Sequence, residues 1–419
     1  MFNIVYSDRC GQVYDNPDIE ALAFDGLSFR EASNTEMIPL PYGSSLSLMP
    51  ERFPLGKYRG KMKCFRTMSG FKEGIFSVSV LLPNGYTRLL LPAYKEQKHV
   101  SPLPLFAYSF TGFKDNGFYV AAHETEKLKQ WDPSQYSTHD LKRKIKKRLQ
   151  KEPGNRLLKH LSHCALYYQC YNAQNIFYER WEGGIPISSV CNAQCCGCIS
   201  FQKEESSGFP SPQNRIVFTP SIEEIVSTGV NHLNRAEKPL LSFGQGCEGE
   251  PTLRGDLLVN SIKEIRRRTD RGTIHLNTNG SNPHVIRKAI EAGLDSIRIG
   301  LNSAKEDNYT AYFKPQTYSF KDVMTSIEMG EKIFLSINLL VIPGFTDREE
   351  ECHALFNLLE KYPVRMVQLR NLNIDPSLYF HVISPPESTV TGMLNFIKLL
   401  KKSFPNLKVG SVNPVTSEQ

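Results

Sequence analysis

The sequence predicts an α/β protein, in which a partial (β/α)6 barrel follows an N-terminal β-rich domain and a helical connector. Three observations predict this class. From Gly184 onward, short runs rich in β-branched residues alternate with longer helical stretches, as in parallel β/α units. Within these runs, polar and apolar side chains alternate one by one. Before residue 125 the chain is rich in Gly, Pro, Ser and aromatic residues, which favours short strands and turns.

Length and composition are those of a globular chain that buries a large core. The chain has 419 residues, 40% of them hydrophobic and 22% charged, and this length favours two domains. No apolar run is long enough to span a bilayer. The first residues do not have the pattern of a secretory signal. We therefore expect a cytoplasmic protein with no membrane partner, whose ten cysteines stay as thiols or bind metal.

Residues 1–137 are expected to form the β-rich domain. The turn signal Pro83-Asn84-Gly85 separates two strand-like runs, 76–82 and 86–92, and predicts a β-hairpin. No chemical motif stands out in this part of the chain, because a lone histidine such as His123 is more often an ordinary surface or core residue than a ligand. The role of this domain does not follow from its sequence.

Residues 138–183 are expected to form the helical connector, which Pro153-Gly154 divides into two helices. The first helix is strongly basic and carries an apolar stripe of Leu141, Ile145 and Leu149. Such a helix is most simply a solvated face that packs on the domain through its stripe. The alternative is contact with a polyanion such as RNA, or with an acidic partner. The net charge of +7 is compatible with both interpretations.

Residues 184–419 are expected to form the barrel. A final helix is predicted near 387–403. The candidate strands are 184–190, 239–243, 273–278, 295–302, 334–342 and 365–372, with a short closing strand at 407–412.

The alternation of side chains along these strands predicts a polar interior. Ile274 and Leu276 alternate with His275 and Asn277, and later strands repeat the pattern. If helices cover the outside, the apolar face packs against them and the polar face lines the interior. A closed barrel is usually filled by branched apolar residues, so a polar interior indicates an active-site cavity. The alternative is a mixed sheet with one solvated face.

Four polar residues of this interior are candidates for contact with a substrate: His275, Arg298, Gln368 and Arg370. The arginine fork suits a carboxylate or phosphate group. The alternative for each residue is a structural, hydrogen-bonded position inside the barrel, because unpaired buried polar groups are costly.

The segment Cys191-Asn-Ala-Gln-Cys195-Cys196-Gly-Cys198 is the most informative motif. Cysteine thiolates are the usual ligands of iron–sulfur clusters, and Cys191, Cys195 and Cys198 can bind three irons of a [4Fe-4S] cluster and leave the fourth open. Cys196 is too close to Cys195 to bind the same cluster. A structural zinc site would need a second Cys or His pair, and none follows at short range. An open iron indicates a place for chemistry.

The remaining cysteines form no second cluster motif in the sequence. We expect them to be buried small hydrophobic residues. They are Cys10, Cys64, Cys164, Cys170, Cys247 and Cys352.

The C-x3-C-x2-C spacing, in the loop after the first barrel strand, resembles the hallmark of the radical S-adenosylmethionine (SAM) superfamily. Gly246, Gly249 and Glu250, followed by Pro251, resemble the Gly-Gly-Glu-Pro element that holds the SAM amino group in that family. The stretch that begins at Gly244 also fits G-x-G-x-x-G. A dinucleotide site is disfavoured, because the third glycine there should open directly into a helix.

Three further strand ends resemble the same family in the expected order. Thr278 and Asn279 match its Thr-Asn-Gly segment near the cofactor. Asn302 and Ser303 lie where the family contacts ribose and carboxylate, and Asn338 lies on the strand that borders adenine.

One residue departs from the family pattern. The residue before the third cysteine is usually aromatic and packs beside the adenine, but here it is Gly197. Packing on the adenine must then come from elsewhere, and Phe201 is a candidate.

The resemblance implies a partial radical SAM barrel with a [4Fe-4S] cluster and SAM as cofactors. SAM would bind the open iron, and an external electron donor of the flavodoxin or ferredoxin type would reduce the cluster. Cleavage of SAM would then give methionine and a 5'-deoxyadenosyl radical that abstracts hydrogen from a substrate.

The substrate class stays open at the level of sequence. The extra N-terminal domain and the basic helix favour a protein, a peptide or an RNA over a small molecule. The cobalamin-binding motif Asp-x-His-x-x-Gly is absent, as is a cysteine in the C-terminal tail for a methyl relay. The competing hypothesis is a non-catalytic metal-cluster module that engages nucleic acid through the basic helix. Glu250 and the polar interior favour the enzyme, because a binding module needs neither.

Overall fold

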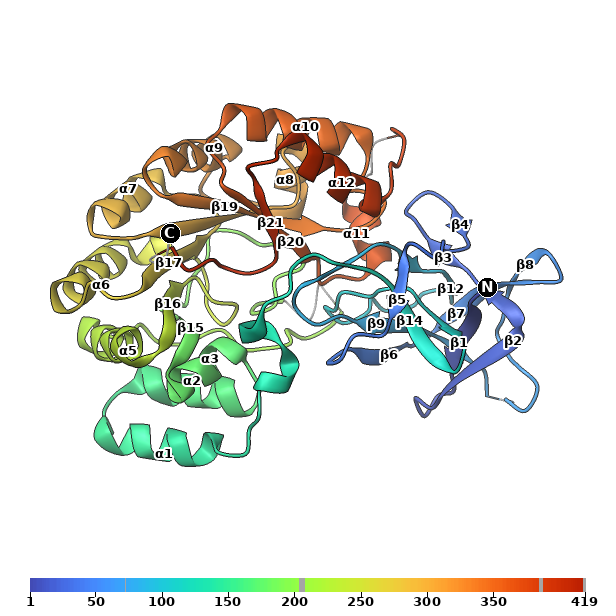
Figure 1. Ribbon diagram of the computed structural model, residues 1–419, viewed down its shortest axis with the longest axis horizontal. Coiled ribbons are helices and arrows are strands. Elements are labelled where there is room, and N and C mark those ends of the chain that lie inside the picture. Colours follow the sequence, from blue (N-terminus) through green and yellow to red (C-terminus); the bar gives the residue numbers. More distant parts are fainter. Residues whose placement is uncertain (72, 203–207, 384–386, 417–419) are drawn as a thin grey trace.

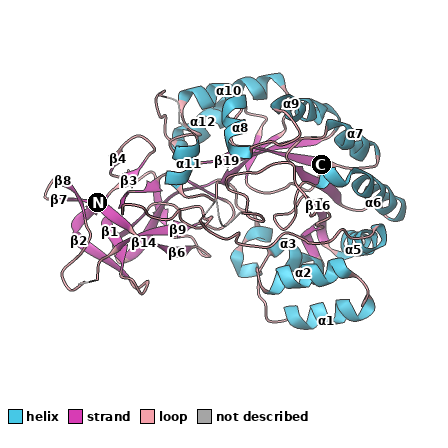
Figure 2. Cartoon of the chain, turned by 180° about the vertical axis from the view of Figure 1, so that it is seen from behind, coloured by secondary structure: helices cyan, strands magenta, loops and turns pink. Residues whose placement is uncertain are grey.

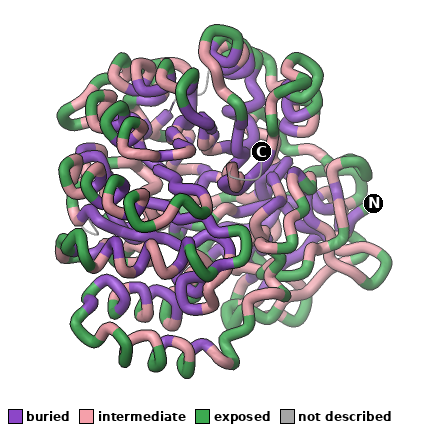
Figure 3. The backbone as a smooth tube through the Cα atoms, turned by 60° about the vertical axis from the view of Figure 1, so that its left-hand side comes forward, coloured by how far each residue is buried: buried purple, intermediate pink, exposed green. Residues whose placement is uncertain are grey.

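The computed structural model describes residues 1–71, 73–202, 208–383 and 387–416. Antiparallel sheets of the N-terminal part lie beside a curled parallel sheet (Figure 1). Figure 2 shows that the helices gather around the parallel sheet, whereas the N-terminal part consists mainly of strands and loops. Figure 3 shows the same layering as burial, with buried strands inside and exposed helix faces outside. The predicted fold class, a partial barrel with an N-terminal β-rich domain, is confirmed.

The N-terminal part folds into an 11-stranded antiparallel sheet and a small three-stranded one. The large sheet contains β1 (Asn3–Ser7), β2 (Val13–Ala21), β5 (Met37–Pro39), β6 (Ser45–Met49), β7 (Arg52–Tyr58), β8 (Lys61–Cys64), β9 (Phe76–Leu81), β10 (Tyr86–Arg88), β12 (Tyr94–Glu96), β13 (Thr111–Lys114) and β14 (Gly117–Glu124). The small sheet contains β3 (Ala23–Phe24), β4 (Phe29–Arg30) and β11 (Leu91–Pro92).

The predicted hairpin around Pro83-Asn84-Gly85 is wrong in its pairing. The two strands are present, but β9 pairs with β1 and β6, while β10 pairs with β14. Because other strands occupy the edges of β9, the turn connects two strands that do not pair with each other. Asn84 is thereby free to reach the parallel sheet.

The connector contains three helices where two were expected: α1 (Leu141–Lys151), α2 (Arg156–Leu166) and α3 (Tyr171–Tyr178). Two short 3-10 turns precede them, η1 (Lys129–Trp131) and η2 (Pro133–Gln135). The Asn155 side chain starts α2 by accepting a hydrogen bond from the Leu158 amide at 3.0 Å. Leu141 and Ile145 of the basic helix are buried, as its apolar stripe predicts.

The parallel sheet has seven strands in chain order. They are β15 (Arg180–Gly184), β16 (Glu237–Phe243), β17 (Thr273–Thr278), β18 (Ser296–Leu301), β19 (Phe334–Val341), β20 (Met366–Asn371) and β21 (Lys408–Gly410). Helices cover its outer face (Figure 1). The helices between and after these strands are α5 (Ile222–Arg235), α6 (Gly255–Arg268), α7 (Pro283–Glu291), α8 (Glu306–Phe313), α9 (Phe320–Glu328), α10 (Glu349–Lys361), α11 (Pro376–Val382) and α12 (Met393–Ser403), with 3-10 turns η3 (Pro251–Arg254) and η4 (Met329–Lys332). Because β15 and β21 stand at opposite ends of the sheet, the barrel is open.

The first parallel strand, β15, lies four residues before the position that the sequence predicts. The predicted strand 184–190 leaves the sheet after Ile185, and the amides of Ile187 and Ser188 donate to the carboxylate of Glu248 at 2.7 and 3.0 Å. A side chain therefore replaces a neighbouring strand as the hydrogen-bonding partner, and this apolar segment forms a loop.

The inner face of the sheet is polar, and the C-terminal tail crosses it (Figure 1). Asn413 donates to Glu182 at 2.9 Å and accepts from Gln368 at 3.0 Å. Further along, the Thr416 amide donates to Thr273 at 2.9 Å. Buried polar groups of several strands are thus satisfied by the tail and by one another.

The N-terminal part docks on the ends of β19 and β20 through two buried arginines. Arg88 donates to the carbonyl oxygens of Val341 and Leu372, at 3.4 and 3.0 Å. Arg52 forms an ion pair with Asp375 at 2.9 Å. Since these contacts bind the two parts to each other at the carboxyl ends of strands, the N-terminal part lies against the mouth of the barrel.

In the described parts of the chain, no helix combines the length and the apolar character that crossing a membrane would require.

Candidate active site

A cavity of about 570 Å³ lies at the carboxyl ends of the parallel strands. This is the end of a β/α barrel at which catalytic groups are found. The cysteine loop, the loop after β16 and the inner faces of β18 to β20 contribute to its wall. Asn84 and Trp131 add to it from the N-terminal part. All major parts of the chain therefore meet around one cavity.

The cysteine loop is fixed by the end of α8. The amide of Cys196 donates to the Tyr312 carbonyl at 3.0 Å, and that of Gln194 donates to Phe313 at 3.0 Å. Cys195 and Cys198 line the cavity. The Cys196 thiol donates instead to the Ala311 carbonyl at 3.7 Å, so it faces α8. The structure thus separates Cys196 from its neighbours in the loop.

The three remaining thiols of the loop lie close enough to interact electrostatically. Burial raises the pKa of the Cys191 thiol to about 11, and the negative charge of Glu250 adds to this effect. Burial raises the pKa of Cys195 still more strongly, with the thiolates of Cys198 and Cys191 as further causes. Three neighbouring, half-buried thiolates repel one another unless cations neutralise them, so this donor set fits a positively charged metal centre.

The spacing of these thiols does not fit a single metal ion. Around one zinc ion, Zn–S bonds of about 2.3 Å place tetrahedral sulfurs about 3.8 Å apart. Among the described residues, one group of His, Cys, Asp or Glu side chains has all its ligand atoms within 4.8 Å of one another. Cys191, Cys195 and Cys198 do not belong to that group. The loop therefore suits a larger centre, such as a cluster, better than the zinc ion considered as its alternative.

Arg215 is a neighbour of the cluster loop that the sequence did not reveal. Its guanidinium donates to the Cys198 sulfur at 3.7 Å and to the Ser200 hydroxyl at 3.3 Å. Its cation also lies over the ring of Phe201, 5.2 Å from the centroid. A cation at this position stabilises thiolate charge. No motif contains Arg215, and only folding brings it to the loop.

Gly249 and Glu250 hold the loop after β16 against the cysteine loop. The Gly249 amide donates to Ser188 at 2.7 Å and the Glu250 amide to Val190 at 2.9 Å. A Cβ atom on Gly249 would lie 2.0 Å from the Val190 oxygen, so only glycine permits this approach. Gly246 of the same loop lines the cavity.

The carboxylate of Glu250 joins this loop to the end of β17. It accepts from the Thr278 hydroxyl at 2.6 Å and from the Asn279 amide at 2.8 Å. Asn279 in turn donates to the side chain of Asn192 at 2.9 Å. Burial raises the pKa of Glu250, whereas these hydrogen bonds lower it. The structure thus brings together the three predicted elements around Cys191, Glu250 and Thr278.

Glu248 is a second buried carboxylate that the sequence did not single out. It accepts from the amides of Gly244 and Gln245, at 2.7 and 2.8 Å, in addition to those of Ile187 and Ser188. Burial raises its pKa to about 7, and the four amides oppose this rise. Glu248 therefore fixes the two loops that carry the cysteines and Glu250.

Arg298 and Arg370 line the cavity. Arg298 donates to Gln368 at 3.0 Å, and Arg370 donates to Asn84 at 3.3 Å and to the Ser411 carbonyl at 2.8 Å. All of these acceptors are neutral, and no ion pair of either arginine occurs among the described residues. Burial lowers the pKa of Arg298 to about 10, and the charge of Arg370 contributes. The nearest anion is the buried Glu182 carboxylate of the same wall, whose charge raises the pKa of both arginines without forming an ion pair with either.

His275 and Gln368 belong to the polar network of the inner face and do not line the cavity. His275 bonds Ser296 through Nδ1 at 2.7 Å and Asn277 through Nε2 at 3.0 Å. Burial lowers the pKa of His275 to about 3, and the charge of Arg298 adds to the effect. Gln368 connects Arg298 to Asn413. Both side chains are therefore placed to position their neighbours.

Of the last three predicted cofactor contacts, one lines the cavity and two do not. Asn338 lines the cavity, and its buried Oδ1 atom accepts no hydrogen bond from the described residues. Asn302 donates instead to the Asn308 carbonyl at 3.0 Å, and Ser303 donates to Glu351 at 2.6 Å. Neither of these two lines the cavity. Asn338 is thus the one with a free acceptor at the cavity.

Gly197 leaves space that an aromatic side chain from α8 occupies. A Cβ atom at residue 197 would lie 2.7 Å from the Tyr312 hydroxyl. Tyr312 and Phe313 both line the cavity. Phe201, by contrast, is 50% exposed and is not part of the cavity wall. The aromatic surface missing from the cysteine loop is therefore present on the neighbouring helix.

Comparison with known proteins finds a family match for part of the chain. Residues 185–356 match the family model of the radical SAM superfamily. A search of curated proteins finds no match. Among solved structures, methylornithine synthase is 14% identical with a TM-score of 0.39, and the alignment covers 68% of this chain and 76% of that one. A spore photoproduct lyase is 15% identical with a TM-score of 0.38, over 54% of this chain and 76% of that one.

The match to the family model contains the cysteine loop, the loop of Glu250 and the Thr278-Asn279 segment. Residues 185–356 therefore form a radical SAM domain, and the protein is an enzyme whose cofactors are a [4Fe-4S] cluster and SAM.

Proposed function

We propose that this enzyme acts on a substrate with a carboxylate or phosphate group, which Arg298 and Arg370 hold in the cavity beside the cluster loop. The observation that carries the proposal is a pair of cavity-lining guanidinium groups that donate to neutral acceptors and form no ion pair among the described residues. One carboxylate, Glu182, lies near these two cations, and an anionic substrate would supply the second negative charge that balances them. Arginine forks also bind such groups in a fixed orientation.

The cluster ligands in this proposal are Cys191, Cys195 and Cys198. When bound and reduced, the [4Fe-4S] cluster supplies the electron that splits SAM into methionine and a 5'-deoxyadenosyl radical. The electron comes from an external donor, for which a flavodoxin or ferredoxin is our candidate. Cys196 is excluded as a ligand because its thiol is directed to Ala311.

For SAM, we assign the side of the cavity that Gly246 lines, next to the loop in which Glu250 holds the Thr278-Asn279 segment, although these last three residues do not line the cavity themselves. Protein donors already engage both carboxylate oxygens of Glu250, so its role includes holding Thr278 and Asn279 in place. The rings of Tyr312 and Phe313 offer the apolar surface that an adenine base needs. Asn338 supplies a free acceptor in the same cavity.

The size of the cavity limits what the radical can reach. A volume of about 570 Å³ falls in the range of small-ligand sites, so no folded macromolecule enters it. The substrate is therefore a small molecule, or a single residue projecting from a peptide or an RNA. The basic helix α1 does not contribute to the cavity wall, so a role for it in binding RNA would lie outside this cavity.

Cleavage of SAM can be tested on anaerobically reconstituted protein with dithionite, by measuring 5'-deoxyadenosine. Cys195→Ala should lose the cluster and the product. Cys196→Ala is the matched control and should keep both, because its thiol faces α8. A Cys196→Ala protein that lost its iron while Cys195→Ala kept it would refute the ligand assignment.

The anion site can be tested with inorganic phosphate as the probe. Phosphate should raise the melting temperature of the wild type, because a ligand that binds only the folded state stabilises it. Arg298→Gln and Arg370→Gln should abolish most of this rise. Arg365→Gln should not, because Arg365 is an exposed arginine just before β20, the strand that carries Arg370. Equal responses in all four proteins would argue against the site.

A further inference from the structure

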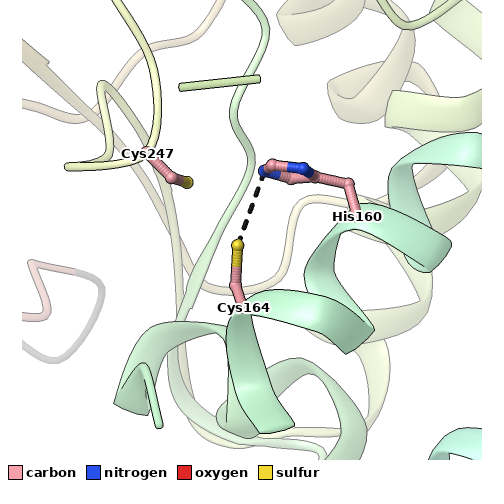
Figure 4. A group of neighbouring side chains, drawn as sticks. All are labelled: His160, Cys164 and Cys247. Carbon is pink, nitrogen blue, oxygen red and sulfur yellow. Dashed lines mark hydrogen bonds between the residues drawn. The ribbon is translucent and has the colours of Figure 1, made fainter. Parts of the chain in front are cut away.

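We propose that His160, Cys164 and Cys247 bind a single zinc ion in the wall of the active-site cavity (Figure 4). The ligand atoms of these three side chains all lie within 4.8 Å of one another. In the sequence they are scattered, and we expected Cys164 and Cys247 to be ordinary buried thiols. The fold brings them together.

Two elements contribute the three side chains. His160 and Cys164 are four residues apart on α2, so they project from the same face of the helix. Two zinc ligands are placed in this way on the helix of His-x3-His metalloenzymes. Cys247 comes from the loop after β16, and its carbonyl oxygen is fixed by the Ile216 amide at 2.8 Å. Figure 4 shows the three side chains converging on one point.

The distances suit one tetrahedral ion. Zinc binds sulfur at about 2.3 Å and imidazole nitrogen at about 2.0 Å, so the two ligand atoms of a tetrahedral site lie about 3.5 Å apart. The Cys164 sulfur and the His160 Nε2 atom are 3.5 Å apart. A [4Fe-4S] cube needs more room between its ligands, and the wider spacing of the loop around Cys195 has that room. The two cysteine groups therefore suit different metal centres.

The surroundings also suit a thiolate-bound ion. Cys164 and Cys247 are buried, while His160 is half-buried. Zinc would displace one proton from each thiol, and the two thiolates would balance its two positive charges. Cysteine and imidazole are the ligands that zinc prefers.

The fourth coordination position of this ion would face the cavity. Both Cys164 and Cys247 line the cavity, together with Cys195 and Cys198. Cys170 also lines it, but its sulfur is not in the group of atoms within 4.8 Å. Three protein ligands with an open position are typical of zinc that binds water or substrate. The ion would thus hold a thiolate or carboxylate of the substrate in the same cavity as SAM.

Metal analysis of purified protein tests the site. Wild type grown with zinc should contain about one zinc per chain, as a site of this type binds one ion. Cys164→Ser and Cys247→Ser should lose it. Cys352→Ser is the matched control, because this buried thiol of α10 lies outside the group. Zinc that is absent from wild type, or lost equally in Cys352→Ser, would overturn the proposal.

A second measurement separates this site from the iron–sulfur cluster. A protein with Cys191, Cys195 and Cys198 all changed to Ala should contain no iron and should still bind zinc. In that protein, added Co²⁺ should give sulfur-to-cobalt charge-transfer bands and intense tetrahedral d–d bands, and His160→Ala should shift them. Since His160 is half-buried, this variant leaves the core intact.

Failure of the zinc site would be distinct from failure of SAM cleavage, because neither measurement requires turnover. Cobalt spectra without sulfur charge transfer would overturn the proposal. So would a Cys164–Cys247 disulfide found by mass spectrometry in the anaerobically purified wild type.

Discussion

Glu248 connects two loops of the site through its buried carboxylate. Its two oxygens accept hydrogen bonds from four backbone N–H groups, which belong to two separate loops. In a barrel, neighbouring loops after the strands usually have no backbone pairing with each other. Here one carboxylate takes the place of that pairing, between the loop that leads to Cys191 and the loop that carries Glu250. The positions of both therefore depend on a residue that need not touch a substrate.

Glu248→Gln should destabilise the protein by about 3 kcal/mol, because an amide nitrogen would face N–H donors that then lack an acceptor. The free energy of unfolding in urea measures this. Glu360→Gln, at an exposed acid of α10, should change it by less than about 0.5 kcal/mol. We also expect weaker SAM binding in Glu248→Gln. An unchanged stability would mean that the four contacts contribute little.

At the scale of residues, spacing within one short segment was predictable and contacts across the fold were not. The C-x3-C-x2-C motif predicts three cluster ligands, because all of them lie in one loop. Arg215 and Glu248 gave no such signal, since their partners are distant in sequence. The strand alternation correctly placed Arg298 and Arg370 on the inner face. It could not tell which inner residues reach the cavity and which, like His275, lie beneath it.

At the scale of elements, β10 and the turn before it form part of the barrel mouth. Arg88 places its guanidinium against the carbonyl oxygens of β19 and of the residue that follows β20. Its backbone amide donates to the Asn371 side chain at 2.9 Å. Burial lowers the pKa of Arg88 to about 9. The N-terminal part thus provides donors for strand ends that would otherwise lack partners.

Arg88→Met should loosen this docking, because carbonyl oxygens of Val341, Leu372 and Tyr108 would lose their donor. We expect a loss of about 2–4 kcal/mol in stability. Hydrogen exchange should rise in β10 and at the end of β20, and change little in β17. Arg9→Met, at an exposed turn, serves as the control. Exchange that rose evenly over the whole chain would contradict a local role.

The elements themselves were partly predictable. Five of the six long parallel strands lie where periodicity places them, because buried strands carry a strong apolar signal. The first one is shifted, since Ile185 and Ile187 have strand-like sequence but Glu248 binds the backbone of that segment. The predicted hairpin is absent for a similar reason. Its turn residues are typical, but β9 pairs with β1 and β6, and β10 pairs with β14.

At the scale of the whole molecule, two buried histidines couple folding to pH. Burial lowers the pKa of His275 to about 3 and that of His232 to about 4. In the unfolded chain each titrates near about 6.5. Below that pH the unfolded state takes up protons that the folded state does not. The free energy of unfolding therefore decreases as the pH is lowered. At pH 5 each histidine accounts for a loss of about 2 kcal/mol.

His275→Gln should therefore reduce the fall in melting temperature between about pH 7.5 and about pH 5, because glutamine does not titrate. His139→Gln is the control, since this side chain is 93% exposed. The anaerobic holoprotein should be used, with the iron content checked at both pH values. A fall that is as steep in His275→Gln as in wild type would show that other groups cause the acid sensitivity.

The bond between Arg370 and Asn84 joins residues that are 286 positions apart. Contacts of such long range form slowly, because the chain must first close a large loop. The wall of the cavity is thus completed late in folding, after local β/α units have formed. Until then the cysteine loop stays accessible from the mouth of the barrel, which leaves a period in which iron and sulfide can be delivered. In an Asn84→Ala protein the cavity wall lacks this bond. Such a protein should acquire its cluster as readily as wild type but lose it faster to chelators.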